Sequence, residues 1–192
     1  MNRIYKQQIQ NYLLAMVTKL LKYPLLILLM TTLTGCPGDE DCNDLGSSTR
    51  VNDLIILTPL QNNYNQGDVI TLKIVIPPNN TFFGEPLNLF EKTNNNYEAY
   101  IETSYSWLFT GNILTFINGS QGSETNNFIA IYNNLNECYE FEVDIKLNKT
   151  GNYTIVTDDS IIFQGNSSCN RYFLNSNILG ANSEDVIQFT VQ

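Results

Sequence analysis

Carboxylates are the most abundant charged side chains in this sequence of 192 residues, which has 19 acidic residues, 10 basic residues and no histidine. Two groups could act in acid–base chemistry: the adjacent pair Asp158-Asp159, and the alternating series of Glu140, Glu142 and Asp144. Adjacent strand residues point to opposite faces, so the pair does not converge, whereas members of the series share one face about 6–7 Å apart. That face could hold a calcium ion, but acidic residues on an exposed strand face more often serve solubility.

No catalytic motif accompanies these carboxylates. The sequence contains no EF-hand loop, no P-loop, and neither a Gly-x-Ser-x-Gly nor a Ser-x-x-Lys motif. Without histidine the commonest general base is missing, and without a Cys-x-x-Cys pair a zinc site is disfavoured. We therefore predict no catalytic residue, no metal and no cofactor, and keep a hydrolase with an acidic site as a less favoured alternative.

Exposed aromatic side chains offer another kind of site, because their rings can stack on sugar faces or fill a pocket of a partner protein. Tyr100 lies in the polar register of its predicted strand, and Phe82 and Phe83 lie in a predicted loop. We name these three residues as candidates for ligand contact. The alternative for the two phenylalanines is that they fold over the edge of the core as a lid. Trp107 falls in the apolar register and is expected in the core.

A period-two alternation of apolar and polar residues runs through the chain after residue 50 and predicts strands. It is clearest over 139–147, where apolar residues alternate with acidic residues and one lysine. The expected strands are 53–59, 69–76, 97–109, 113–117, 128–132, 139–147, 152–157, 161–164 and 185–192. Residues 118–125 and the stretch around Cys169 are expected as loops. Short strands separated by turns predict an all-β domain, an antiparallel β-sandwich.

The turn after the strand 139–147 has a characteristic spacing. Leu147, Gly151 and Tyr153 form a Leu-x-x-x-Gly-x-Tyr passage, which resembles the corner between strands E and F of immunoglobulin-like domains. The resemblance implies an immunoglobulin-like β-sandwich over residues 51–192, although the inter-sheet cysteine pair of antibody domains is missing.

The N-terminal stretch has the composition of an export signal. Two lysines precede an apolar run, residues 24–34, which is too short to span a bilayer but fits the core of a signal peptide. The run ends in Leu33-Thr34-Gly35-Cys36, which resembles the lipobox of bacterial lipoproteins. The resemblance implies that residues 1–35 are cleaved as a signal peptide. Cys36 would then be the lipidated N-terminus, held in the membrane by diacylglyceryl and acyl chains.

A short acidic run follows this cysteine. Asp39, Glu40 and Asp41 resemble the export signal of surface-exposed lipoproteins in the Bacteroidetes; the alternative is a solvated tether. The resemblance implies a protein of the outer membrane that is exposed at the cell surface, with the periplasmic face as the alternative location. We expect residues 36–50 to form an acylated, flexible tether, and keep Met16 as an alternative start to Met1.

Charge and cysteine content restrict the partners further. The first 35 residues carry four basic side chains and no acidic one, so their removal changes the formal net charge from −9 to −13. Such an acidic chain disfavours nucleic acid, which is bound through patches of lysine and arginine. Three cysteines remain besides the lipidated one, which implies one disulfide and one free thiol. We favour Cys138–Cys169 as the disulfide, because Cys42 lies in the tether.

One modification site is suggested by Asp159-Ser160-Ile161, which resembles the O-glycosylation motif of Bacteroidetes envelope proteins and makes Ser160 a candidate. Together with the candidate aromatic residues, these features predict a membrane-anchored lipoprotein with a non-catalytic module that binds a glycan or an envelope protein. A structural accessory subunit of an outer-membrane complex is the alternative.

Overall fold

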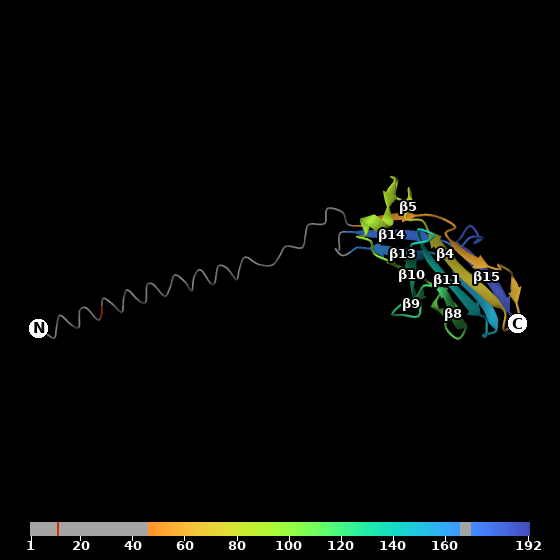
Figure 1. Ribbon diagram of the computed structural model, residues 1–192. Helices are drawn as coiled ribbons and strands as arrows, with labels where there is room; N and C mark the ends of the chain where they lie inside the picture. Colours follow the sequence, from red (N-terminus) through yellow and green to blue (C-terminus); the bar gives the residue numbers. More distant parts are fainter. Residues whose placement is uncertain (1–10, 12–45, 166–169) are drawn as a thin grey trace, which may run out of the picture. The chain divides into compact units, whose positions relative to one another are not determined.

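The computed structural model describes residues 46–165 and 170–192, together with the single residue Asn11. The chain divides into two compact units, and everything below concerns the second, Asn43–Gln192. The described part of this unit consists mainly of strands (Figure 1), so the all-β prediction is confirmed. None of the helices in the described residues is both long and apolar enough to cross a membrane.

Among the described residues, ten strands form one large sheet, sheet A, which is curled into a half-barrel. Eight strands follow one another across the sheet in the order β1 (Ser47–Arg50), β14 (Arg171–Ser176), β13 (Asp159–Gln164), β7 (Glu98–Glu102), β10 (Asn127–Asn133), β11 (Cys138–Lys146), β4 (Val69–Ile76) and β2 (Ile55–Thr58). The other two are β8 (Ile113–Asn118), which pairs with β11, and β9 (Ser120–Gln121), which pairs with β10. The curl brings β2 against the chain that leaves β14, where Ile55 and Ile178 form a parallel bridge.

The remaining strands form two smaller sheets. Within the described residues, sheet B has the order β12 (Gly151–Val156), β15 (Val186–Val191) and β3 (Asn63–Tyr64). A two-stranded sheet pairs β5 (Asn79–Asn80) with β6 (Leu87–Asn88). The short helices α2 (Leu89–Lys92) and α3 (Ser106–Phe109) follow β6 and β7.

Side chains from sheets A and B share one hydrophobic core. In β11 the alternation places Tyr139, Phe141, Val143 and Ile145 inside, each with no exposed surface. Burial of a side chain of this size contributes about 1.5–3 kcal/mol. The predicted face of this strand is therefore the face that the core uses.

The segment β8–β9 changes partner in the middle of sheet A. β10 and β11 pair with each other as far as Ile131 and Glu140. Beyond these residues β10 pairs with β9 and β11 pairs with β8. Gly119 makes the change possible, since its φ is +83° and a Cβ there would lie 2.3 Å from the carbonyl oxygen of Ile129. Only glycine fits such a position.

The prediction of one strand over 97–109 is wrong in its second half, because β7 ends at Glu102 and α3 follows. Tyr105, Leu108 and Phe109 are buried, which is the i, i+3, i+4 spacing of a helix. Trp107 is partly buried against the core, and its ring lies 4.9 Å from that of Tyr153. The prediction failed because the aromatic residues at 105, 107 and 109 also fit the period of two that is typical of a strand.

Among the described residues, six strands lie where the sequence predicted none: the two-residue strands β3, β5, β6 and β9, the last of them within the expected loop 118–125, and the longer strands β1 and β14. β1 occupies residues of the expected tether, and its polar side chains give no alternation; its pairing with β14 supplies the order. β14 lies in the expected loop around Cys169. Its central residues Tyr172, Phe173 and Leu174 are all apolar, because both faces of the strand are covered in part, and this hides the alternation.

The corner after β11 carries the chain from sheet A into sheet B. The Tyr153 hydroxyl donates to the Lys149 carbonyl oxygen at 2.5 Å, four residues upstream. A tyrosine hydroxyl that bonds to the backbone a few residues upstream is also found at the corner of immunoglobulin-like domains. An immunoglobulin-like topology for the whole domain stays a prediction.

Candidate ligand-binding site

A row of four apolar side chains crosses the outer face of sheet A. Tyr100 on β7 pairs with Ile129 on β10 and with Ile162 on β13, and Ile162 pairs with Phe173 on β14. The neighbours of Tyr100 along β7 are fully buried, so the row points away from the core. Tyr100 is 41% exposed, which leaves part of its ring available for contact.

Polar residues border this row on both sides. β7 and β14 run in the same direction, because each is antiparallel to β13 between them. Glu102 lies two residues beyond the row on β7, and Arg171 lies two residues before it on β14. They are therefore on opposite sides, separated by roughly 13 Å along the strands. Asn127 pairs with Glu102 and Gln164 with Arg171, so an amide accompanies each charge.

The hairpin after β8 stands beside the row and completes a hollow. The Gly122 amide donates to the Asn127 carbonyl at 2.7 Å, and the Gln121 side chain donates to the same carbonyl at 2.9 Å, which fixes the hairpin to β10. The hollow has a volume of about 870 Å³. It is lined by Tyr100, Ile101, Glu102, Gln121, Gly122, Ser123, Asn127, Ile129, Ile162, Gln164, Arg171 and Phe173.

The polar groups around Tyr100 are held by their neighbours. Its hydroxyl donates to Glu98 Oε2 at 3.3 Å, and partial burial, followed by the charge of Glu98, raises the pKa of the tyrosine. Arg171 donates from Nε and Nη2 to Gln164 Oε1 at 3.1 and 2.9 Å. The hollow thus offers an apolar floor, an oriented ring, amides, a cation and a carboxylate, a set that suits binding of a polar organic ligand.

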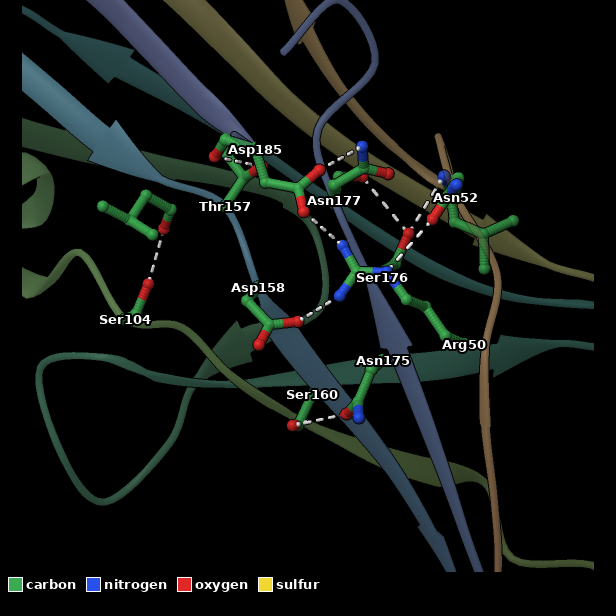
Figure 2. Close-up of polar contacts among 12 residues, drawn as sticks. Arg50, Asn52, Ser104, Thr157, Asp158, Ser160, Asn175, Ser176, Asn177 and Asp185 are labelled. Carbon is green, nitrogen blue, oxygen red and sulfur yellow. Dashed lines mark hydrogen bonds and ion pairs between the residues drawn. The ribbon is translucent and has the colours of Figure 1, made fainter. Parts of the chain in front are cut away.

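A second polar cluster lies at the corner where β1 meets the turns before β13 and β15 (Figure 2). Arg50 donates to Asp158 at 2.8 Å and to Asp185 at 2.7 Å. Asn177 donates to the other oxygen of Asp185 at 3.0 Å and accepts from the backbone amide of Asp53 at 2.7 Å. These groups bind one another and join four chain segments, so the cluster serves the fold.

The adjacent acids Asp158 and Asp159 do point in different directions, as predicted. Asp158 is exposed and paired with arginine, whereas Asp159 is fully buried. The Tyr105 hydroxyl donates to Asp159 Oδ2, and Oδ1 has no hydrogen-bond partner in the described part of the chain. Burial raises the pKa of Asp159 to about 7, although the hydrogen bonds from Tyr105 and the Ser104 backbone act in the opposite direction.

The acidic series on β11 faces outward, and every member is bound by a neighbour. The donors are Lys73 for Glu142 at 2.7 Å, Thr71 for Asp144 at 2.6 Å, and Asn133 and Asn136 for Glu140 at 2.9 and 2.7 Å. The two asparagine hydrogen bonds lower the pKa of Glu140. Within residues 46–165 and 170–192 no group of three acidic or cysteine side chains is placed to hold a metal.

Of the three aromatic candidates, only Tyr100 lines the hollow. Phe82 and Phe83 are partly buried against the core, as a lid would be. Thr49 donates to the Phe82 carbonyl at 2.8 Å, and the Phe83 ring meets that of Tyr172 edge to face at 5.3 Å. The loop that carries them is therefore fixed to β1 and β14.

The remaining candidates are described in part. Those outside the described residues are Cys36, Asp39, Glu40, Asp41 and Cys169. Cys138 has no disulfide partner among the described residues, and burial, followed by the charges of Glu140 and Glu137, raises the pKa of its thiol. Ser160 lies on the outer face and donates to Asn175 at 2.8 Å (Figure 2); its modification stays a prediction.

Several lining residues were not among the candidates, namely Ile129, Ile162, Arg171 and Phe173. A signal for three of them exists in the sequence, because apolar residues are consecutive over 128–131, 161–163 and 172–174. Such runs place apolar side chains on both faces of a strand, including the outer one. For Arg171 the sequence gives no comparable signal.

Comparison with protein-family models, curated proteins and solved structures finds no match for this chain.

Proposed function

We propose that this protein is a lipid-anchored protein of the cell envelope whose sheet A binds a glycan in the hollow around Tyr100. The observation that carries the proposal is the row of apolar side chains, with an oriented tyrosine between two isoleucines and amides on both sides of the row. The carbon-bound hydrogens of a sugar face suit the ring and the isoleucines, while its hydroxyls suit the amides and the carboxylate. A binding module of this kind needs no catalytic group.

The geometry gives less support to a hydrolase with an acidic site. Asp159 is buried beside Tyr105, and the carboxylates of β11 are engaged by neighbouring donors. In the hollow, the lining includes one carboxylate, Glu102. A glycosidase uses a pair of carboxylates across the scissile bond, and this lining supplies no pair.

Anchoring through Cys36, exposure at the outer surface of the outer membrane and an immunoglobulin-like arrangement of the domain belong to the same proposal. They are supported by the lipobox-like Leu33-Thr34-Gly35-Cys36, the acidic run that follows it, and the corner at Tyr153. A surface-exposed binding module would then be held at the membrane by its acylated cysteine.

Binding is tested on a glycan array with the protein and the variant Tyr100→Ala. We expect loss of the ring to weaken binding at least tenfold, since truncation of a central aromatic contact costs about 2 kcal/mol or more. The matched control is Tyr97→Ala, which removes a ring of similar exposure (48%) that lies outside the hollow. Equal loss in both variants, or no glycan bound by the unchanged protein, overturns the proposal.

Anchoring is tested separately in cells that express the full chain. Cys36→Ser should release the protein from the membrane fraction and abolish incorporation of labelled palmitate, whereas the control Cys42→Ser should change neither. Digestion by proteinase K on intact cells would support surface exposure; protection until lysis would place the domain on the periplasmic side.

A further inference from the structure

The two arginines of sheet A are held in different ways. Arg50 forms ion pairs with two carboxylates. Arg171 forms none among the described residues, and its cross-strand partner is the neutral Gln164. A glutamate at 164 would neutralise the arginine; the glutamine orients it and leaves its positive charge unbalanced.

The part of Arg171 that stays available is well defined. A guanidinium has five N–H donors, and Gln164 Oε1 takes one from Nε and one from Nη2. The donors that remain are both N–H groups of Nη1 and the second one of Nη2. They form the end of the guanidinium, which matches the two oxygens of a planar carboxylate.

We propose that the ligand of the hollow is an acidic sugar whose carboxylate binds the free end of Arg171; this inference rests on the proposed glycan-binding function. The hollow then holds the sugar ring over the row around Tyr100. A single negative charge matches the single cation of the lining, whereas a doubly charged phosphate would be repelled more strongly by Glu98, which lies two strands away on the Arg171 side of the row.

The opposite side of the row fixes the direction in which the ligand lies. Glu102 and Asn127, which pair across β7 and β10, are roughly 13 Å from Arg171 along the strands. A carboxylate there would repel a second acidic group but accepts hydrogen bonds from sugar hydroxyls. We therefore expect the acidic residue of the sugar chain at the Arg171 end and an uncharged portion at the Glu102 end.

The test uses a neutral oligosaccharide that ends in a single galacturonate residue, and the methyl ester of the same molecule, which differ in charge and share the same sugar chain. Affinities are measured by calorimetry for the unchanged protein, Arg171→Gln, Arg171→Lys and Tyr100→Ala. We expect the unchanged protein to bind the acid about tenfold to a hundredfold more tightly than the ester, as for a charge-assisted hydrogen bond. Arg171→Gln should bind both forms as weakly as the unchanged protein binds the ester, and Arg171→Lys should keep part of the preference.

The outcomes separate this inference from the function on which it rests. Equal binding of acid and ester, or a preference that persists in Arg171→Gln, overturns the acidic ligand while glycan binding stands. Binding of neither form, with a neutral glycan bound on the array through Tyr100, has the same meaning. If no glycan binds at all, both proposals fall. The Arg171 variants are checked by circular dichroism, and since the side chain is exposed we expect them to fold.

Discussion

The outer face of sheet A has two halves that treat their polar groups in opposite ways. On β4 and β11, every acidic side chain of the alternating series is bound by a neighbouring donor. On β14, β13, β7 and β10, apolar side chains occupy the row, and Arg171 is oriented by a neutral amide. The first half is a satisfied, solvated surface. The second half has partly exposed apolar side chains and an arginine without an ion-pair partner among the described residues, and these surround a hollow. That difference distinguishes a candidate binding surface from one that only contacts water.

The segment β8–β9 separates the two halves, so breaking it should have the largest effect. Gly119→Ala places a Cβ against the Ile129 carbonyl at a positive φ, and we expect a loss of about 4 kcal/mol from strain and overpacking. Urea unfolding measures it. The control Gly111→Ala has a similar φ of +87°, but a Cβ there would meet only the Lys149 side chain, at an ordinary contact distance of 3.8 Å, and should cost only about 1–2 kcal/mol. Equal costs would contradict a steric role for Gly119.

Asp159 on β13, whose side chain is buried in the core, and Glu140 on the outer face of β11 should respond to pH with opposite sign. The pKa of Asp159 is about 7 in the folded protein and 3.8 in the unfolded chain. The folded state therefore holds this proton more tightly, and stability falls as pH rises from about 4 to about 7. Below this window the carboxyl is protonated in both states and costs nothing.

Urea unfolding at pH 5 and pH 8 tests this on Asp159→Asn. At pH 8 this variant should be more stable than the unchanged protein by a few kcal/mol. Its unfolding free energy should fall much less between pH 5 and pH 8 than that of the unchanged protein. Glu140→Gln is the counterpart on β11. The pKa of Glu140 is lowered in the folded state, so its charged form stabilises the protein at pH 8 and this variant should be less stable there. The same sign for both variants would refute the contrast.

A smaller effect should distinguish the apolar residues of the two halves. Ile162→Ser removes part of the floor of the hollow, and we expect the affinity for the glycan found on the array to fall about tenfold. Val75→Ser makes a comparable change on β4, where the side chain is 38% exposed, and should leave the affinity unchanged. Calorimetry with both variants decides whether the floor contributes.

The smallest effect is expected on the satisfied half. Lys73→Ala removes an ion pair whose lysine side chain is 45% exposed, so unfolding free energy should fall by less than about 1 kcal/mol. Binding should not change. A measurable loss of affinity in this variant would show that the binding surface extends across both halves.

The sequence was most informative where one face of a strand is buried and the other is exposed to solvent. β4 and β11 were predicted almost to the residue, because their alternation records a buried and a solvated face. Tyr100 was found for the same reason, as an aromatic residue in a polar register. α3 was missed because Tyr105, Trp107 and Phe109 fit the periods of a strand and of a helix in part.

The hollow could not be predicted, because it depends on which strands are neighbours. Ile129, Tyr100, Ile162 and Phe173 come from four separate strands, and only their register places them in one row. Arg171 was assigned to a loop, so its relation to Gln164 across a strand pair could not be inferred. Pairing between distant segments is set by the whole fold, and local patterns do not report it.

The parallel pairing of β1 with β14 has a mechanical consequence. In the proposed anchored protein, any drag on a bound ligand is opposed at the N-terminus, and tension enters the domain through β1. A pull directed along β1 would load its four residue pairs with β14 at once, so these contacts would have to shear together. Arg50, at the far end of β1, ties the strand to two further turns. The attachment point is thus built to resist traction, and the strand that receives the force is paired directly to one that lines the hollow.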